Sequence, residues 1–73
     1  MIKTVSANQA FQVQHNGFSA NIPTDCYMWV SADGVNYYKY EDEEIKAGNL
    51  QVQGIKDGSY VYFDAGSNIV VLL

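Results

Sequence analysis

The chain has 73 residues, one Cys, one His, eight acidic residues and four Lys without Arg, for a formal net charge of −4. A single Cys excludes an intrachain disulfide, and one Cys with one His supplies too few ligands for a closed zinc site, which needs about four. Phosphate binding depends on clustered cations, so the composition argues against nucleic acid and against anionic membrane surfaces. We therefore expect one domain over residues 1–73, with no metal and no cofactor.

The N-terminal stretch "MIKTVSANQAF" has no long apolar run and no cleavage site of small residues. It predicts neither a signal peptide nor a transmembrane segment, so the chain is expected in a cytoplasm or assembled there. Strict apolar/polar alternation, punctuated by Gly or Asn about every ten residues, continues along the chain. This pattern predicts an all-β fold, a small antiparallel β-sandwich or compact jelly-roll of six to seven short strands.

The segment 11–22, "FQVQHNGFSANI", gives the clearest hairpin signal. A two-residue type I′ turn at Asn16-Gly17 would place Val13 opposite Ala20 and give Gly17 a positive φ. The apolar positions of both arms then share one face and the polar positions share the other. Pro23 lacks a backbone donor and is expected to end the second arm.

The next segment, "CYMWVSADGVNYYKY", contains a second predicted hairpin. A two-residue turn at Asp33-Gly34 would place Trp29 opposite Tyr38 and Tyr27 opposite Tyr40, with four aromatics on one side. A three-residue loop with Gly34 left-handed fits equally and shifts the partners by one. The register therefore stays open. Ser31-x-Asp33-Gly34 also forms a partial Asp box, a motif that mainly stabilises hairpins.

The acidic run Glu41 to Glu44 predicts a solvated loop, because crowded like charges repel one another. Its spacing does not match an EF-hand loop, so a calcium site is not expected. In the following segment 49–63, a two-residue turn at Asp57-Gly58 would place Val52 opposite Phe63 and leave Tyr60 and Tyr62 outward. The C-terminal "IVVLL" predicts one more apolar strand.

Catalysis is the first function to test, and the sequence argues against it. A nucleophile such as Cys26 with His15 as base would need a cleft, an oriented base and usually a third group. Cys26 lies in an alternating strand and His15 abuts a turn, so both fit structural positions better. We expect no enzyme activity.

The aromatic surplus is the feature most suggestive of binding. One Trp, six Tyr and three Phe are more than the core of so thin a sandwich needs. The candidate residues of a protein interface are Tyr27, Trp29, Tyr38, Tyr40, Tyr60 and Tyr62. Three interpretations remain open: a layer of the core, an interface with another protein chain, in which Tyr and Trp are enriched, and a platform for stacking sugar rings.

The runs "VSANQAFQV", "YMWVSADGVNYYKY" and "NLQVQGIKDGSYVYF" with the terminal apolar strand resemble small β-sandwich virion proteins of tailed bacteriophages. The similarity is to auxiliary or decoration proteins on the heads of crAss-like phages, and it extends over nearly the whole chain. It implies a non-catalytic protein of the virion that binds capsid or head proteins, and its own copies are a further candidate partner. The alternative function is a small carbohydrate-binding module of a fibre or adhesion apparatus.

Overall fold

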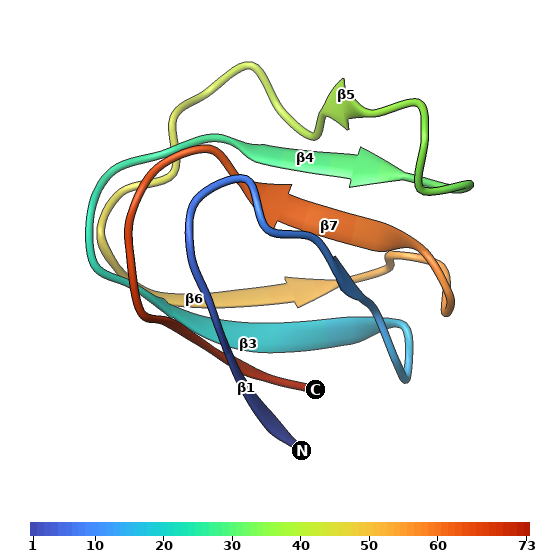
Figure 1. The fold of residues 1–73 in the computed structure, drawn as a ribbon, viewed down its shortest axis with the longest axis horizontal. Helices are drawn as coiled ribbons and strands as arrows, with labels where there is room; N and C mark the ends of the chain where they lie inside the picture. The colour runs from blue at the N-terminus through green and yellow to red at the C-terminus, as the bar shows by residue number, and fades with distance from the viewer.

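A computed structural model describes residues 1–73 as eight strands without a helix, stacked in two layers (Figure 1). Sheet A has the strand order β1-β8-β3-β6 and sheet B the order β2-β7-β4-β5, and all pairs are antiparallel. The all-β sandwich prediction is confirmed, with eight strands rather than six or seven. Nothing in the structure is a helix that could cross a membrane. The strands are β1 (Ile2–Val5), β2 (Phe11–Gln12), β3 (Gly17–Ile22), β4 (Met28–Ser31), β5 (Tyr38–Lys39), β6 (Gly48–Gln53), β7 (Tyr60–Phe63) and β8 (Ile69–Leu72).

The core between the sheets contains apolar side chains at alternate strand positions, as the sequence pattern predicts. Its aromatic members are three Phe: the Phe11 and Phe18 rings meet edge to face at 5.1 Å, and Phe63 lies 6.1 and 6.3 Å from them. No Tyr or Trp is fully buried. The buried apolar residues are Val5, Phe11, Val13, Phe18, Ala20, Ile22, Cys26, Met28, Val52, Ile55, Val61, Phe63, Ile69 and Val71.

The hairpin predicted over residues 11–22 is wrong in register and in partner. The turn residues are His15 and Asn16, with φ of 58° and 59°, while Gly17 has no positive φ and begins β3. A Cβ at Gly17 would collide with the backbone carbonyl oxygen of Val52 on β6, so the glycine permits close approach of two strands.

The arms of that segment separate into different sheets. β2 pairs with β7, with Phe11 opposite Val61, whereas β3 pairs with β6 and β8. Val13 is therefore not opposite Ala20, which faces Leu50 and Val71 instead. The apolar/polar alternation is compatible with the predicted hairpin and with the observed pairing, because the same side of each arm is buried in both.

The segment 49–63 behaves in the same way. The turn at Asp57-Gly58 is present, with Gly58 at φ 93° and the Ser59 N–H donating to the Lys56 carbonyl at 3.0 Å. The flanking strands β6 and β7 nevertheless belong to different sheets. Val52 is consequently not opposite Phe63, so the predicted pairing is wrong although both side chains are buried as expected.

The hairpin β4–β5 is the one connection that joins neighbouring strands of a sheet directly. Trp29 lies opposite Lys39 and Val30 opposite Tyr38, which is the shifted register of the two left open. The predicted loop over Glu41 to Glu44 is exposed and strand-free, and β3 ends directly before Pro23.

Candidate functional site

The outer surface of sheet B carries a cluster of aromatic side chains. Residues directly opposite in a ladder share a face, and Trp29 on β4 is opposite both Tyr62 on β7 and Lys39 on β5. The same face continues through Tyr60, opposite Ser31. We call this surface the aromatic face; its members are Tyr27, Trp29, Tyr37, Lys39, Tyr60, Tyr62 and Asp64.

The rings of the aromatic face contact one another. The Trp29 and Tyr62 rings are stacked, with centroids 6.1 Å apart and planes at 7°, and Tyr37 meets Tyr62 edge on at 4.9 Å. The Lys39 ammonium lies 4.3 Å from the Tyr27 ring centroid and 5.8 Å from that of Trp29. Since Tyr62 and Lys39 come from the strands on either side of β4, the indole has a neighbour on each flank.

Asp64 fixes the orientation of two members of this face. Its Oδ1 accepts a hydrogen bond from the Tyr27 backbone N–H at 2.8 Å, and its Oδ2 accepts one from Trp29 Nε1 at 3.1 Å. Trp29, Tyr27 and Asp64 are all partly buried. The indole is therefore held in place by a stacked ring and by a charge-assisted hydrogen bond, while part of it stays accessible to a partner.

The partial Asp box lies at the end of the aromatic face and has a structural role. Asp33 Oδ1 accepts hydrogen bonds from the Val35 and Asn36 N–H groups at 2.8 and 2.9 Å, and Ser31 Oγ donates to it at 2.8 Å. These bonds hold the pKa of the Asp33 carboxyl well below its usual range. A Cβ added at Gly34 would lie 3.2 Å from the Tyr60 ring, so this loop and that ring are in close contact.

Two of the six predicted interface residues lie elsewhere. Tyr38 is opposite Val30, which belongs to the inward side of β4, and its side chain is 66% exposed at the sheet margin. The Tyr40 N–H donates to the Met28 carbonyl, which places Tyr40 on the same inward side. A side with the four aromatics Tyr27, Trp29, Tyr38 and Tyr40 belongs to the unshifted register, and the structure has the shifted one.

Sequence reasoning missed Tyr37, Lys39 and Asp64. Only the shifted register of the β4–β5 hairpin brings Lys39 beside Trp29. One of the two registers left open by the sequence therefore already predicted this neighbour. Asp64 continues the β4–β7 ladder, where its backbone N–H donates to the Tyr27 carbonyl at 3.1 Å. Tyr37 reaches Tyr62 from a loop, and no periodicity of the sequence indicates such a contact.

The residues considered for catalysis do not form a site. Cys26 is buried, and its pKa is raised to about 11, chiefly by desolvation and then by the charge of Asp64. His15 belongs to the turn before β3, which lies at the opposite end of the sandwich from the segment between β3 and β4 that contains Cys26 (Figure 1). No group of three or more His, Cys, Asp or Glu side chains converges as a metal site would require.

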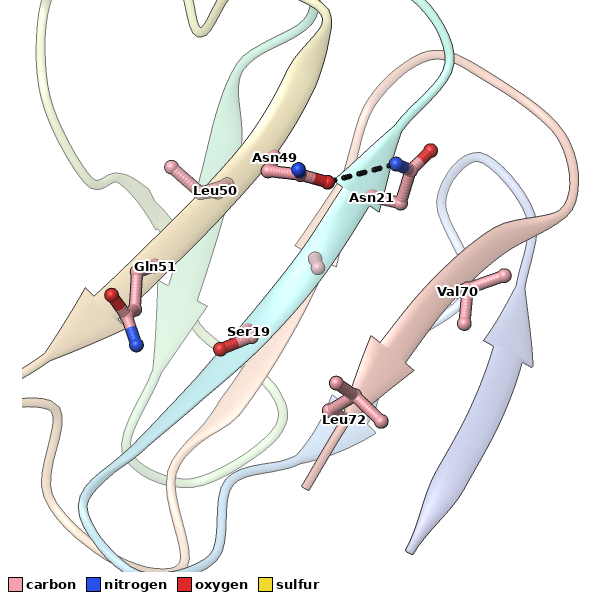
Figure 2. A pocket seen from close by; sticks show the side chains of 8 residues that line it. Ser19, Asn21, Asn49, Leu50, Gln51, Val70 and Leu72 are labelled. Carbon is pink, nitrogen blue, oxygen red and sulfur yellow. Dashed lines mark hydrogen bonds between the residues drawn. The ribbon is translucent and has the colours of Figure 1, made fainter.

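The outer face of sheet A is different in chemistry. A hollow on this face has a volume of about 410 Å³, and the Asn21 Nδ2 donates to the Asn49 Oδ1 at 2.9 Å. Figure 2 shows this amide pair, with Val70 and Leu72 projecting from the neighbouring strand β8. None of the lining residues is charged or aromatic. The amide side chains and the aromatic rings therefore occupy opposite outer faces of the sandwich.

The aromatic face offers a contact area in which the Trp29 indole is held by the Tyr62 ring and the Asp64 carboxylate. Comparison with protein-family models, with curated proteins and with solved structures found no match to this chain. Geometry and chemistry are therefore the grounds for any function assigned to this surface, and they fit recognition of another surface.

Proposed function

We propose that the chain is a non-catalytic interaction protein that binds another protein chain through the aromatic face. The observation that carries this proposal is the assembled ring cluster around Trp29, stacked on Tyr62 and anchored by Asp64 on the outside of sheet B. Three Phe already supply the aromatic part of the core. Tyr and Trp contribute large contact area with few rotatable bonds and dominate many protein interfaces.

The partner we propose is a subunit of a tailed-phage head, which the chain would bind as an auxiliary or decoration protein of the virion. Support for this partner class comes from the sequence resemblance, and support for the binding surface comes from the aromatic face. Binding at junctions between subunits needs no catalytic group, consistent with a buried Cys26 and a turn position for His15.

A sugar site is the weaker candidate. Stacking on sugar needs an accessible ring with amide and carboxylate partners beside it. Here Tyr62 and Lys39 flank the Trp29 ring, and Asp64 already accepts two hydrogen bonds from the chain itself. The Asn21 and Asn49 amides lie on the other sheet. This separation favours a protein partner.

Photo-crosslinking in assembled heads tests the proposal. The photoreactive residue p-benzoylphenylalanine replaces Tyr37 on the aromatic face or, as the matched control, Asn21 on the outer face of sheet A. We expect a covalent product with a head subunit from position 37 and none from position 21. Absence of the chain from purified heads, or equal crosslinking from both positions, would contradict the proposal.

A further inference from the structure

β6 leaves a row of backbone groups without partners along one edge of sheet A. It pairs with β3 alone, and the Gly54 N–H donates to the Asn16 carbonyl at 3.0 Å. Bonded and non-bonded pairs alternate in an antiparallel ladder, so the N–H and C=O groups of Asn49, Gln51 and Gln53 point away from β3. No other backbone or side-chain group bonds to them.

A groove runs beside this edge, between β6 and the segment that follows β5. Its volume is about 240 Å³, and its apolar lining comes from Met28, Tyr40, Ile45, Leu50 and Val52. Glu41 and Glu43 also line it, and no Lys does. The lining of the groove thus combines apolar side chains with two carboxylates.

We propose that the β6 edge binds an extended segment of another protein chain, which pairs with it as a fifth strand of sheet A. Free donors and acceptors at every second residue match the spacing of such a strand. Alternate apolar side chains of the segment would enter the groove. The negative charges of Glu41 and Glu43 would attract a segment whose remaining positions are basic. The occupant is therefore an alternating apolar and basic peptide segment.

A second copy of this chain that pairs through its own β6 fits the edge poorly. It would carry its own acidic run from Glu41 to Glu44 to the same region, and the whole chain has a net charge of −4. Like charges brought together in an interface oppose association. The β6 edge is separate from the aromatic face, so this inference stands independently of the proposed function and gives the chain two binding surfaces.

Amide hydrogen exchange of the full chain tests the proposal, with a capped peptide of about eight alternating Val and Lys residues as the probe. The amides of Asn49, Gln51 and Gln53 should exchange quickly in the free protein, and the peptide at millimolar concentration should slow them by about tenfold or more. The same peptide with N-methylated alternate amides, which cannot donate to β6, should have no effect. An unchanged exchange at all three amides, or equal protection by the methylated peptide, overturns the proposal.

Two variants sharpen the result. Gln51→Pro removes an outward N–H and is tolerable on an edge strand, so it should abolish binding while Gln51→Ala retains it. Should Gln51→Pro not fold, the double variant Glu41→Gln with Glu43→Gln should still weaken binding several-fold at low salt.

Two further outcomes distinguish peptide binding at the β6 edge from self-association there and from binding at the aromatic face. Protection of the same amides that grows with protein concentration, without peptide, would assign the edge to a second copy and overturn the proposal. Trp29→Ala should leave peptide binding unchanged, so failure of the aromatic face as an interface is distinguishable from failure here.

Discussion

Trp29 on β4 stacks on Tyr62 on β7 with ring planes at 7°, and its Nε1 donates to Asp64 at 3.1 Å. Both rings are partly buried on the outside of the sandwich rather than enclosed in the core. Each ring therefore contributes to folding through its neighbour and keeps accessible area for a partner. Experiments on Trp29 have to measure folding and association separately.

The first prediction concerns the energetic coupling of this pair. In urea unfolding, a double-mutant cycle of Trp29→Ala and Tyr62→Ala should give a coupling free energy of about 0.5–1.5 kcal/mol, because each substitution removes the same stacking contact. Tyr38→Ala is the matched control, since Tyr38 is 66% exposed and contacts no other ring, and it should couple to neither. Additive effects of Trp29→Ala and Tyr62→Ala would show that the stacking contributes nothing.

The second prediction separates association from folding. Trp29→Ala should weaken binding to heads prepared without the chain by on the order of 2 kcal/mol or more, since buried Trp residues dominate many interfaces. The free energy of unfolding of the free domain should fall by less than this. Co-sedimentation with the heads and urea unfolding of the same variant give the two numbers, with Tyr38→Ala again as the control. A variant that unfolds as a free domain would instead assign the indole to folding.

The third prediction concerns Gly17, where the structural reason differs from the one predicted. A Cβ here meets the Val52 carbonyl oxygen and approaches the Gln53 Cα at 3.3 Å, so Gly17→Ala should lower the free energy of unfolding by about 1–3 kcal/mol. Gly54→Ala is the matched control for backbone strain, because Gly54 has φ 84° but open space around it. It should cost about 1 kcal/mol.

An equal loss of unfolding free energy in Gly17→Ala and Gly54→Ala would indicate that β3 and β6 can move apart to accommodate the new Cβ. In that case the close approach at Gly17 would not limit the packing of sheet A. Melting temperatures of the two variants, measured under one set of conditions, decide between these outcomes.

The sequence predicted which side of each strand is buried better than it predicted the strand partners. Val13, Ala20, Val52 and Phe63 are all core residues as expected, because a side-chain period of two fixes the face of a strand from local information. Pairing depends on long-range packing, which alternation does not encode. Neither Val13 with Ala20 nor Val52 with Phe63 forms a pair, since both segments cross between the sheets.

The candidate site was predicted in part for the same reason. Tyr27, Trp29, Tyr60 and Tyr62 share the outer face of sheet B. That Tyr27 and Trp29 lie on the same face follows from their spacing of two residues alone. The position of Tyr38 could not be decided from the sequence, because a shift of one residue in the β4–β5 register moves its side chain to the other face. The loop between β4 and β5 is longer than two residues and is built around the Asp33 carboxylate. Turn propensity did not predict the hydrogen bonds that this carboxylate accepts.

The fourth prediction concerns the pH dependence of this loop. The hydrogen bonds to the Asp33 carboxylate depress its folded-state pKa below its unfolded value of about 3.9, so its stabilisation is present above that value and is lost as pH falls through the folded pKa. Wild-type stability should therefore fall more steeply than that of Asp33→Asn as the pH drops below about 4.

Urea unfolding between neutral and acidic pH measures the difference, with Asp42→Asn as the control because Asp42 is exposed. Parallel curves for wild type and Asp33→Asn would contradict the assigned role of Asp33.

The fifth prediction concerns the reactivity of Cys26. Its pKa of about 11, raised first by burial and then by Asp64, leaves about one thiolate in a thousand at pH 8, against about a quarter for an ordinary cysteine near 8.5. Iodoacetamide should therefore modify Cys26 at least on the order of a hundredfold more slowly than an exposed thiol.

Reciprocal backbone hydrogen bonds between Cys26 and Ile45, at 3.0 and 2.7 Å, also hold the Cys26 segment against the sandwich, so labelling requires this segment to open. Ser67→Cys provides the exposed thiol in the same chain, and mass spectrometry counts the labels: one should appear fast and the second only as urea unfolds the domain. Rapid double labelling in buffer would mean that the Cys26 segment opens independently of the sandwich, and the buried position of this thiol would then not protect it.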